Sequence, residues 1–277
     1  TDKGAPPGSR LRRSAASSMP SPDRGSASGA LSRVFTYGGQ MDDMTCALGP
    51  EPIAIIGLSA IMPKAASVGE FWRNIVTGAE CLEDVPETRW RLSDYFSQNA
   101  SERDKTYGRR GGFMPDLDFD PVEFGMPPSV LDSTDPAQLF GLALARAALV
   151  DAGYPALSET DHHRTSVILG VAGTTMQRAG SLSARMEYPA IGQAMEEAGI
   201  DPATRERVIR RFGENYPDWD ENSFPGYLAN LVPGRIAHRF DLGAASYAVD
   251  AACASSLCAI RLACSELRSG HCNLAVT

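Results

Sequence analysis

The sequence predicts an α/β fold, in which a parallel or mixed β-sheet is covered by helices. Short apolar runs alternate with longer stretches of helical periodicity, in the order strand, helix, strand, helix, strand, helix, strand. The chain has 277 residues, 43% of them hydrophobic, which is enough for one large domain or two small ones. In sheets of this kind we expect chemistry where the carboxyl end of a strand meets the N-terminus of a helix.

The first part of the chain is predicted to be a tail outside the fold. Residues 1–33 are mostly Ser, Pro, Gly, Ala and Arg, which offer little to bury, so we expect disorder over 1–50. A linker from an upstream domain is the favoured interpretation. An organelle-targeting leader is the alternative, because Arg10, Arg12 and Arg13 stand among many serines.

The ordered part is expected to begin at Pro52 and to open with a buried strand. Residues 53–57 form a continuous apolar run, as expected for a strand covered on both faces. Residues 68–78 predict an amphipathic helix that ends at Gly78. Residues 83–130 are rich in Pro, Gly, Asp and Arg, and indicate a long excursion of loops.

The middle of the chain predicts the best-defined helix. Asp135 can accept hydrogen bonds from its first turn, and Pro136 suits the first helical position. Apolar residues then run nearly all round the helix until Gly153 ends it, so we expect it to be buried. Residues 165–171 predict a second buried strand, and the charged helical stretch 190–216 is expected to be peripheral.

The last part of the chain repeats the alternation. Residues 225–240 predict a helical stretch that is broken near Pro233. A third strand is predicted over 247–251, a third core helix over 254–268, and the start of a fourth strand over 273–276.

Cys253 lies at the corner between the strand 247–251 and the helix 254–268. The free amides of a helix N-terminus favour an anion, so we expect a thiolate at Cys253 to be stabilised and to act as a nucleophile at neutral pH. The neighbouring alanines leave room around the sulfur for a thioester-borne substrate. The alternative is a buried structural cysteine.

Composition argues against several other classes of protein. The net charge of −8 argues against nucleic acid as the main partner. No apolar run approaches the roughly 20 residues of a membrane helix, and the N-terminus lacks an apolar signal-peptide core. We therefore expect a cytoplasmic protein. The six cysteines include no C-x-x-C pair, so we expect reduced thiols and no metal site.

The four histidines are not predicted to be catalytic. His162 and His163 precede a strand in a polar loop, and His238 lies at a helix end. His271 follows the helix that starts at Cys253, and the length of that helix puts its two ends roughly 20 Å apart.

Other polar residues near the corner are expected to have structural roles. Asp250 suits a hydrogen bond beside Cys253, and Ser255 suits a donor at the start of the helix. Residues 170–175 predict a close-packed turn rather than a phosphate loop, because they lack G-x-G-x-x-G. Arg235 and Arg239 are expected either to meet an acidic carrier protein or to form ion pairs within the chain.

Residues 249–257, with the sequence Val-Asp-Ala-Ala-Cys-Ala-Ser-Ser-Leu, resemble the active-site signature of β-ketoacyl synthases, the condensing domains of polyketide and fatty acid synthases. The likeness extends over about 52–277. Three places are similar to iterative synthases of the polyunsaturated fatty acid, enediyne and glycolipid kind, namely 131–138, 182–185, and 222–226 together with 234–237.

The resemblance implies a fold and an activity. The fold is thiolase-like, with two similar halves that each hold a mixed five-stranded sheet, stacked with helices between them. This chain would hold the N-terminal half only, over 51–277, and the domain would form a homodimer. Cys253 would accept an acyl group from the phosphopantetheine thioester of an acyl carrier protein, and pass it to a decarboxylated malonyl unit. The domain itself would need no cofactor.

The resemblance also implies that part of the site lies in the second half of the domain. Two histidines of that half stabilise the enolate in the family, so we expect the truncated chain to be inactive in condensation. The alternatives are a relative that only loads or decarboxylates acyl thioesters, and a non-catalytic scaffold or dimerisation remnant.

Overall fold

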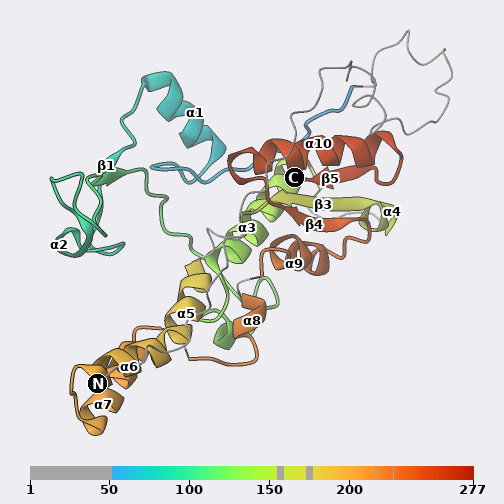
Figure 1. The fold of residues 1–277 in the computed structure, drawn as a ribbon. Coiled ribbons are helices and arrows are strands. Elements are labelled where there is room, and N and C mark those ends of the chain that lie inside the picture. The colour runs from blue at the N-terminus through green and yellow to red at the C-terminus, as the bar shows by residue number, and fades with distance from the viewer. Residues whose placement is uncertain (1–51, 155–158, 173–176, 217, 227) are drawn as a thin grey trace, which may run out of the picture. The chain divides into compact units, whose positions relative to one another are not determined.

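The computed structural model describes residues 52–154, 159–172, 177–216, 218–226 and 228–277 (Figure 1). The chain divides after residue 50 into two units, of which the second holds all of these residues. The tail predicted over 1–50 lies outside the described residues.

Three parallel strands form the central sheet. β3 (Thr165–Gly170) lies in the middle, between β4 (Ser246–Val249) and β5 (Leu274–Val276). Val167 pairs with Ser246 on one side and with Val276 on the other. The predicted strands at 165–171, 247–251 and 273–276 are thereby confirmed. Among the described residues the sheet has three strands, compared with the mixed five-stranded sheet that the resemblance implies for one half of the fold.

Helices cover both faces of β3, as the sequence predicts for a strand without polar alternation. Val167 packs in one core cluster with Leu142 of α3 (Pro136–Asp151) and Ile236 of α9 (Leu231–Arg239). Ile168 points to the opposite face, because side chains alternate along a strand. It packs there against α10 (Ser255–Arg268), whose buried stripe is small and includes Ala259 and Ala263. Figure 1 shows α10 lying along the sheet, with α9 on the other side.

The first turn of α3 is capped as predicted. The Asp135 carboxylate accepts a hydrogen bond from the Ala137 N–H at 2.9 Å, and Pro136 occupies the first helical position. Gly153 follows the helix with a φ of 80°, which a glycine adopts without strain. Along most of its length α3 is at least half-buried, although Val150 is 54% exposed.

The prediction of a helix broken near Pro233 is wrong in its position. The helical stretch is interrupted earlier, between α8 (Ser223–Gly226) and α9, and Pro233 lies inside the first turn of α9. The first N–H groups of a helix have no intrahelical acceptor, so a proline costs little there.

The prediction of a strand over 53–57 is also wrong. This segment pairs with no strand of the described chain, and Ile55 is 81% exposed. The two residues that follow it are bonded to α3, since the Leu58 N–H donates to Asp151 and the Ser59 hydroxyl donates to the Leu144 carbonyl. An apolar run is predicted to be a strand from its own residues, but a strand also needs a neighbour to accept its backbone hydrogen bonds.

The helix predicted at 68–78 is confirmed as α1 (Val68–Thr77). The Ser67 hydroxyl accepts from the Glu70 N–H, and Gly78 ends the helix in the left-handed conformation with a φ of 63°. The apolar face of α1 is not buried by the described residues, since Trp72 is 63% exposed.

The excursion predicted over 83–130 is confirmed. It contains only short elements, namely β1 (Glu83–Asp84), α2 (Leu92–Tyr95), β2 (Arg110–Gly111) and η1 (Pro128–Val130), with β1 and β2 paired antiparallel.

The charged stretch 190–216 is helical and carries no buried residue, which confirms its predicted peripheral position. It forms α6 (Tyr188–Glu197) and α7 (Pro202–Gly213), after α5 (Gln177–Met186). The rings of Tyr188 and Phe212 join α6 to α7. The remaining helix, α4 (Glu159–His163), leads into β3.

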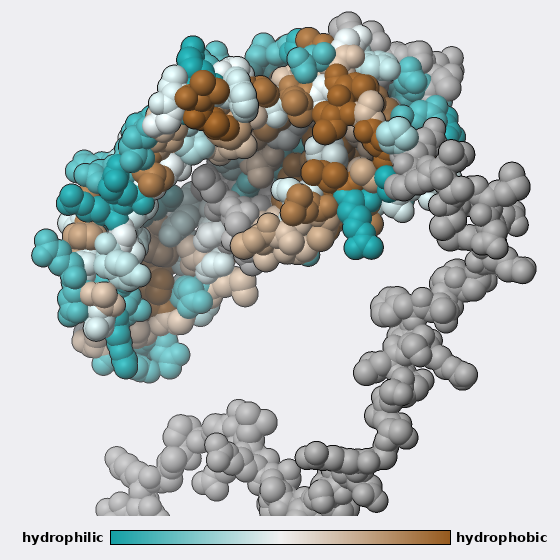
Figure 2. All heavy atoms as spheres, turned by 90° about the horizontal axis from the view of Figure 1, so that it is seen from above, coloured by the Kyte–Doolittle hydropathy of each residue, from teal (hydrophilic) through white to brown (hydrophobic). Residues whose placement is uncertain are grey.

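Large apolar side chains remain exposed on several elements. On α10, Leu257 is 73% exposed and Ile260 is 46% exposed, on the side turned away from the sheet. Figure 2 shows hydrophobic patches on one face of the molecule. No helix among the described residues is both long enough and apolar enough to cross a membrane.

Candidate active site

Cys253 lies at a sharp corner that joins the carboxyl end of β4 to α10. The chain leaves β4 at Val249, passes through the short 3-10 helix η3 (Ala252–Ala254), and continues directly into α10. Cys253 is exposed, so the interpretation of a buried structural cysteine is wrong. The side chain is accessible at the place where the sequence predicted a reactive group.

The backbone of this corner is held in an unusual conformation. Ala252, which directly precedes Cys253, has a φ of 48°, a left-handed conformation that residues with a Cβ rarely adopt. The Asp250 carboxylate accepts from the Ala252 N–H at 3.1 Å, which agrees with the structural hydrogen bond expected of Asp250. The Ser255 hydroxyl accepts from the Ala251 N–H at 2.9 Å and donates to the Ala252 carbonyl at 2.7 Å.

The backbone N–H of Cys253 is available to a ligand. It precedes the first complete turn of α10, and it donates to no acceptor among the described residues. The amides at a helix N-terminus carry a partial positive charge, so this N–H can stabilise an oxyanion that forms beside the sulfur.

The end of β3 packs directly against the first turn of α10. A Cβ built on Gly170 would lie 2.7 Å from the carbonyl carbon of Ser255 and from the nitrogen of Ser256. Only glycine permits this approach. The close packing predicted for 170–175 is found at Gly170, which is the last residue of β3, while 173–175 lie outside the described residues, so the predicted turn stays a prediction. Sequence reasoning missed the left-handed Ala252, for which the residues carry no signal.

All four histidines lie at the opposite edge of the sheet from Cys253. His162 and His163 precede β3, His238 precedes β4, and His271 precedes β5. Because the three strands are parallel, all four belong to their N-terminal edge, whereas Cys253 follows the carboxyl end of β4. His162 lies 3.1 Å from the Asp241 carbonyl, and His271 lies 3.2 Å from a Glu266 carboxylate oxygen.

The other cysteines of the described residues are free thiols. Cys81, Cys258 and Cys264 are half-buried and Cys272 is buried, all as free thiols, while Cys46 lies outside the described residues. Within the described ranges no three His, Cys, Asp or Glu side chains are grouped so that they could hold a metal ion.

Arg235 and Arg239 both bond within the chain, although to neutral acceptors rather than in the expected ion pairs. The Arg235 guanidinium donates to the Gln138 side-chain oxygen, and Arg239 donates to the Glu123 carbonyl. Burial lowers the pKa of Arg235 from its ordinary value. Gln138 is fully buried, and its amide donates to the Pro225 and Gly226 carbonyls at 2.9 Å. Arg235 is therefore part of the packing between α3, α8 and α9.

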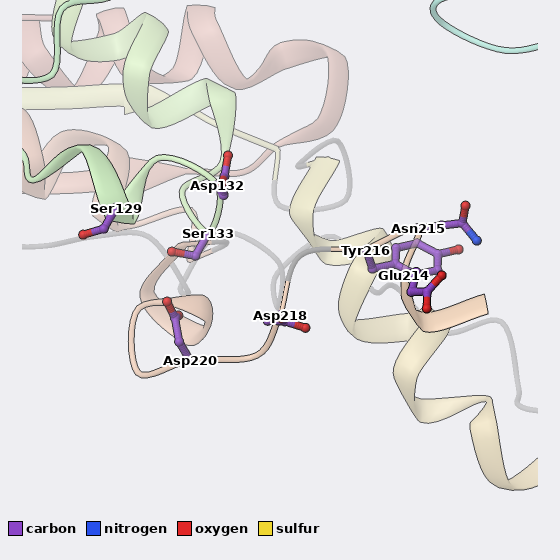
Figure 3. A pocket seen from close by; sticks show the side chains of 8 residues that line it. All are labelled: Ser129, Asp132, Ser133, Glu214, Asn215, Tyr216, Asp218 and Asp220. Atoms are coloured by element: carbon purple, nitrogen blue, oxygen red, sulfur yellow. The ribbon is translucent and has the colours of Figure 1, made fainter. Parts of the chain in front are cut away.

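A separate hollow lies between the loop before α3 and the segment after α7 (Figure 3). Its lining includes four carboxylates, those of Asp132, Glu214, Asp218 and Asp220, and no basic side chain. The Ser223 hydroxyl donates to Asp220 and lowers the pKa of that carboxyl. Cys253 is not part of this lining, so the hollow is not the place of the predicted chemistry.

The fold and the corner define an α/β protein with an accessible cysteine at a strand-to-helix junction. The family model "Beta-ketoacyl synthase, N-terminal domain" matches residues 50–277. The chain therefore belongs to the β-ketoacyl synthase family.

The chain is similar to both polyunsaturated fatty acid synthases and polyketide synthases. It is 36% identical over 225 residues to one chain of the polyunsaturated fatty acid synthase from a Thraustochytrium species, in a match that covers 81% of this chain and 8% of that protein. It is 29% identical over 228 residues to polyketide synthase PksN from Bacillus subtilis, covering 82% of this chain and 4% of the relative. The chain thus spans less than a tenth of the length of these multidomain synthases.

Solved ketosynthase structures share the fold. The oxazolomycin ketosynthase domain OzmH KS7 of Streptomyces albus is 26% identical, with a TM-score of 0.55, and the match covers 79% of this chain and 32% of that one. The ketosynthase from module 6 of the bacillaene synthase of Bacillus subtilis is 23% identical, with a TM-score of 0.55, covering 80% and 30%. These structures are thiolase-like ketosynthase domains, as the resemblance implied, and the chain spans about a third of each.

Proposed function

We propose that the chain is the nucleophile-bearing part of a condensing acyltransferase in a polyketide or polyunsaturated fatty acid synthase. The observation that carries the proposal is the exposed Cys253 beside its own free backbone N–H, at the start of α10. Family membership supports it, because members of this family are named for β-ketoacyl synthesis.

In the first step Cys253 takes up the acyl group. Its thiolate sulfur attacks the carbonyl carbon of an acyl thioester, and the developing oxyanion accepts a hydrogen bond from the Cys253 N–H. The C–S bond to the carrier then breaks, and the carrier thiol leaves with a proton from solvent. The acyl group is now a thioester on Cys253.

In the second step the acyl group is transferred. Loss of CO₂ from a malonyl thioester leaves an enolate, whose carbon attacks the acyl carbonyl on Cys253. A new carbon–carbon bond forms and the bond to Cys253 sulfur breaks, which restores the thiolate. The two histidines expected to stabilise the enolate belong to the second half of the domain, in keeping with the distant position of the four histidines of this chain.

The partners follow from this chemistry. The acyl and malonyl groups would arrive as phosphopantetheine thioesters on an acyl carrier protein, and the domain would add no cofactor of its own. The complete domain would act as a cytoplasmic homodimer. The multidomain nature of the relatives supports a carrier partner.

Acyl loading tests the proposal. The full-length protein is incubated with the octanoyl thioester of N-acetylcysteamine, and tandem mass spectrometry locates the octanoyl group within the tryptic peptide 240–261, which carries both Cys253 and Cys258. We expect loading on Cys253 and its loss in Cys253→Ala.

The matched control is Cys258→Ala, which removes a half-buried cysteine of the same helix and should leave loading unchanged. A folded wild-type protein that never takes up the octanoyl group would overturn the proposal in favour of a scaffold. Loading without carbon–carbon bond formation after addition of malonyl-coenzyme A would reduce the proposed activity to acyl loading.

A further inference from the structure

Ser255 is a buried side chain that is bonded to the backbone around Cys253. It is 5% exposed and lies two residues after Cys253, at the first position of α10. Its hydroxyl makes two hydrogen bonds to the corner, accepting from the Ala251 N–H and donating to the Ala252 carbonyl. The Ser255 N–H also donates to the Ala252 carbonyl.

The Ala252 carbonyl belongs to the same peptide group as the Cys253 N–H. A trans peptide group is planar, so its C=O and N–H point in opposite directions. Whatever fixes the Ala252 oxygen therefore also fixes the direction of the Cys253 N–H. A donor on the carbonyl also polarises the peptide group, which strengthens its N–H as a hydrogen-bond donor.

This peptide group needs such support because the residue before it is strained. Ala252 holds a φ of 48°, a conformation that costs free energy for a residue with a Cβ. Asp250 holds the Ala252 N–H, and Ser255 holds the Ala252 carbonyl. Without the Ser255 hydroxyl, the Ala252 carbonyl keeps only its bond to the Ser255 N–H, and the 252–253 peptide can then tilt and turn the Cys253 N–H away from the substrate of the sulfur.

We propose that Ser255 is a positioning residue, whose hydroxyl orients the 252–253 peptide so that the Cys253 N–H serves as an oxyanion donor. The inference rests on the proposed acyl transfer at Cys253 and adds a second residue to it. Ser256, the next residue, is exposed and its hydroxyl makes no hydrogen bond within the described structure, so it provides the matched comparison.

The test compares two reactions of the same sulfur in the full-length protein. Octanoyl transfer from N-acetylcysteamine passes through an oxyanion, whereas alkylation by iodoacetamide does not. In Ser255→Ala we expect the maximal rate of octanoyl loading to fall roughly 10- to 100-fold, with KM for the thioester little changed, because an oxyanion donor acts in the transition state. The rate of alkylation of Cys253 should stay within about threefold of wild type, and Ser256→Ala should match wild type in both reactions.

Three results would overturn the inference. The first is equal rates of octanoyl loading in Ser255→Ala and Ser256→Ala. The second is an equal loss of loading and alkylation in Ser255→Ala, which would indicate a purely structural role. The third is a fall in loading through KM alone. A wild-type protein that does not load octanoyl groups would instead refute the proposed function, so the two failures are distinguishable.

A second variant covers the case in which Ser255→Ala does not fold. Glycine adopts a positive φ without strain, so adding Ala252→Gly relieves the strain of the corner without restoring the hydroxyl donor to its carbonyl. We expect the double variant to fold and to load slowly. Loading by this double variant at the wild-type rate would also overturn the inference.

Discussion

Ala252 holds a backbone conformation that residues with a Cβ rarely adopt, and hydrogen bonds from both of its sides hold it there. The run of alanines around Cys253 is explained from the sequence as room for a substrate. The structure adds a second reason, because a small side chain is the easiest to accommodate at a strained corner. The position of Cys253 could be predicted from a motif, but the φ of its neighbour could not, since alanine carries no sequence signal for a positive φ.

Gly170 is the residue that sets how closely α10 approaches the sheet. A methyl group in Gly170→Ala would meet the backbone of Ser255 and Ser256 at 2.7 Å, so we expect this variant to lose roughly 1–3 kcal/mol of folding free energy. Urea unfolding monitored by circular dichroism measures this loss. Gly180→Ala is the control, because a Cβ there meets nothing within 4 Å. Equal midpoints for the two variants would contradict the close packing.

Tyr247 gives the fold a dependence on alkaline pH. Burial raises the pKa of its phenol above the ordinary value of 10.0, with smaller contributions from Glu266 and Cys272. The unfolded state therefore releases this proton first, so the contribution of Tyr247 to stability is complete below pH 10.0 and is lost as the pH rises through the folded-state pKa.

The measurement is the free energy of unfolding between pH 9 and pH 11. We expect wild type to lose stability more steeply than Tyr247→Phe over this interval. Tyr107→Phe, which removes a tyrosine that is 72% exposed, is the comparison variant. A common slope for all three proteins would contradict the assignment to Tyr247.

Helices whose ends are marked by capping residues could be predicted from the sequence. Elements whose formation depends on pairing with a distant segment could not. α1 and α3 begin and end at capping residues that are visible in the sequence, and both are confirmed. The run 53–57 has the composition of a strand, but no strand of the described chain lies beside it. Likewise, Pro233 was predicted to break a helix because the sequence did not show that the helix starts only two residues earlier.

The start of α3 depends on Asp135, whose carboxylate caps the Ala137 N–H in a buried position. We expect Asp135→Ala to lower the free energy of unfolding by about 1–2 kcal/mol, as for other helix caps, and Asp135→Asn to lower it by less, because an amide oxygen can also accept the hydrogen bond. Thermal unfolding of the two variants beside wild type measures the difference. An asparagine variant as unstable as the alanine variant would show that the negative charge, rather than the cap, is what matters.

For the molecule as a whole, the exposed apolar residues of α10 and the position of the histidines both agree with a domain whose site is completed by a second half. Leu257 and Ile260 form an apolar outer side of α10, on the helix that carries Cys253 at its start. In a thiolase-like domain of two stacked halves, helices lie between the halves, so this is the side that the second half is expected to cover. The composition of α10 could predict a helix, but not which of its sides the described residues leave uncovered.

If the second half of the domain supplies the groups that stabilise the enolate, acyl loading on Cys253 can occur without condensation. We expect the 277-residue chain to form no carbon–carbon bond from octanoyl-N-acetylcysteamine and malonyl-coenzyme A. Its four histidines lie at the N-terminal edge of the sheet, opposite the edge at which Cys253 lies. Liquid chromatography with mass spectrometry would detect the 3-oxodecanoyl product. Its appearance with this chain alone, and its loss in Cys253→Ala, would show that the chain supplies its own enolate-stabilising groups.

The order of strands also has a consequence for synthesis of the protein on the ribosome. β3 is the central strand, yet both of its neighbours come later in the chain, and β5 follows it by roughly 100 residues. At ordinary translation speeds β3 would therefore wait roughly 5–20 s with an unpaired edge before its last partner is made. Its fully apolar centre is a ready site for aggregation during that interval. The nascent chain should accordingly depend on chaperones most strongly between the emergence of β3 and that of β5.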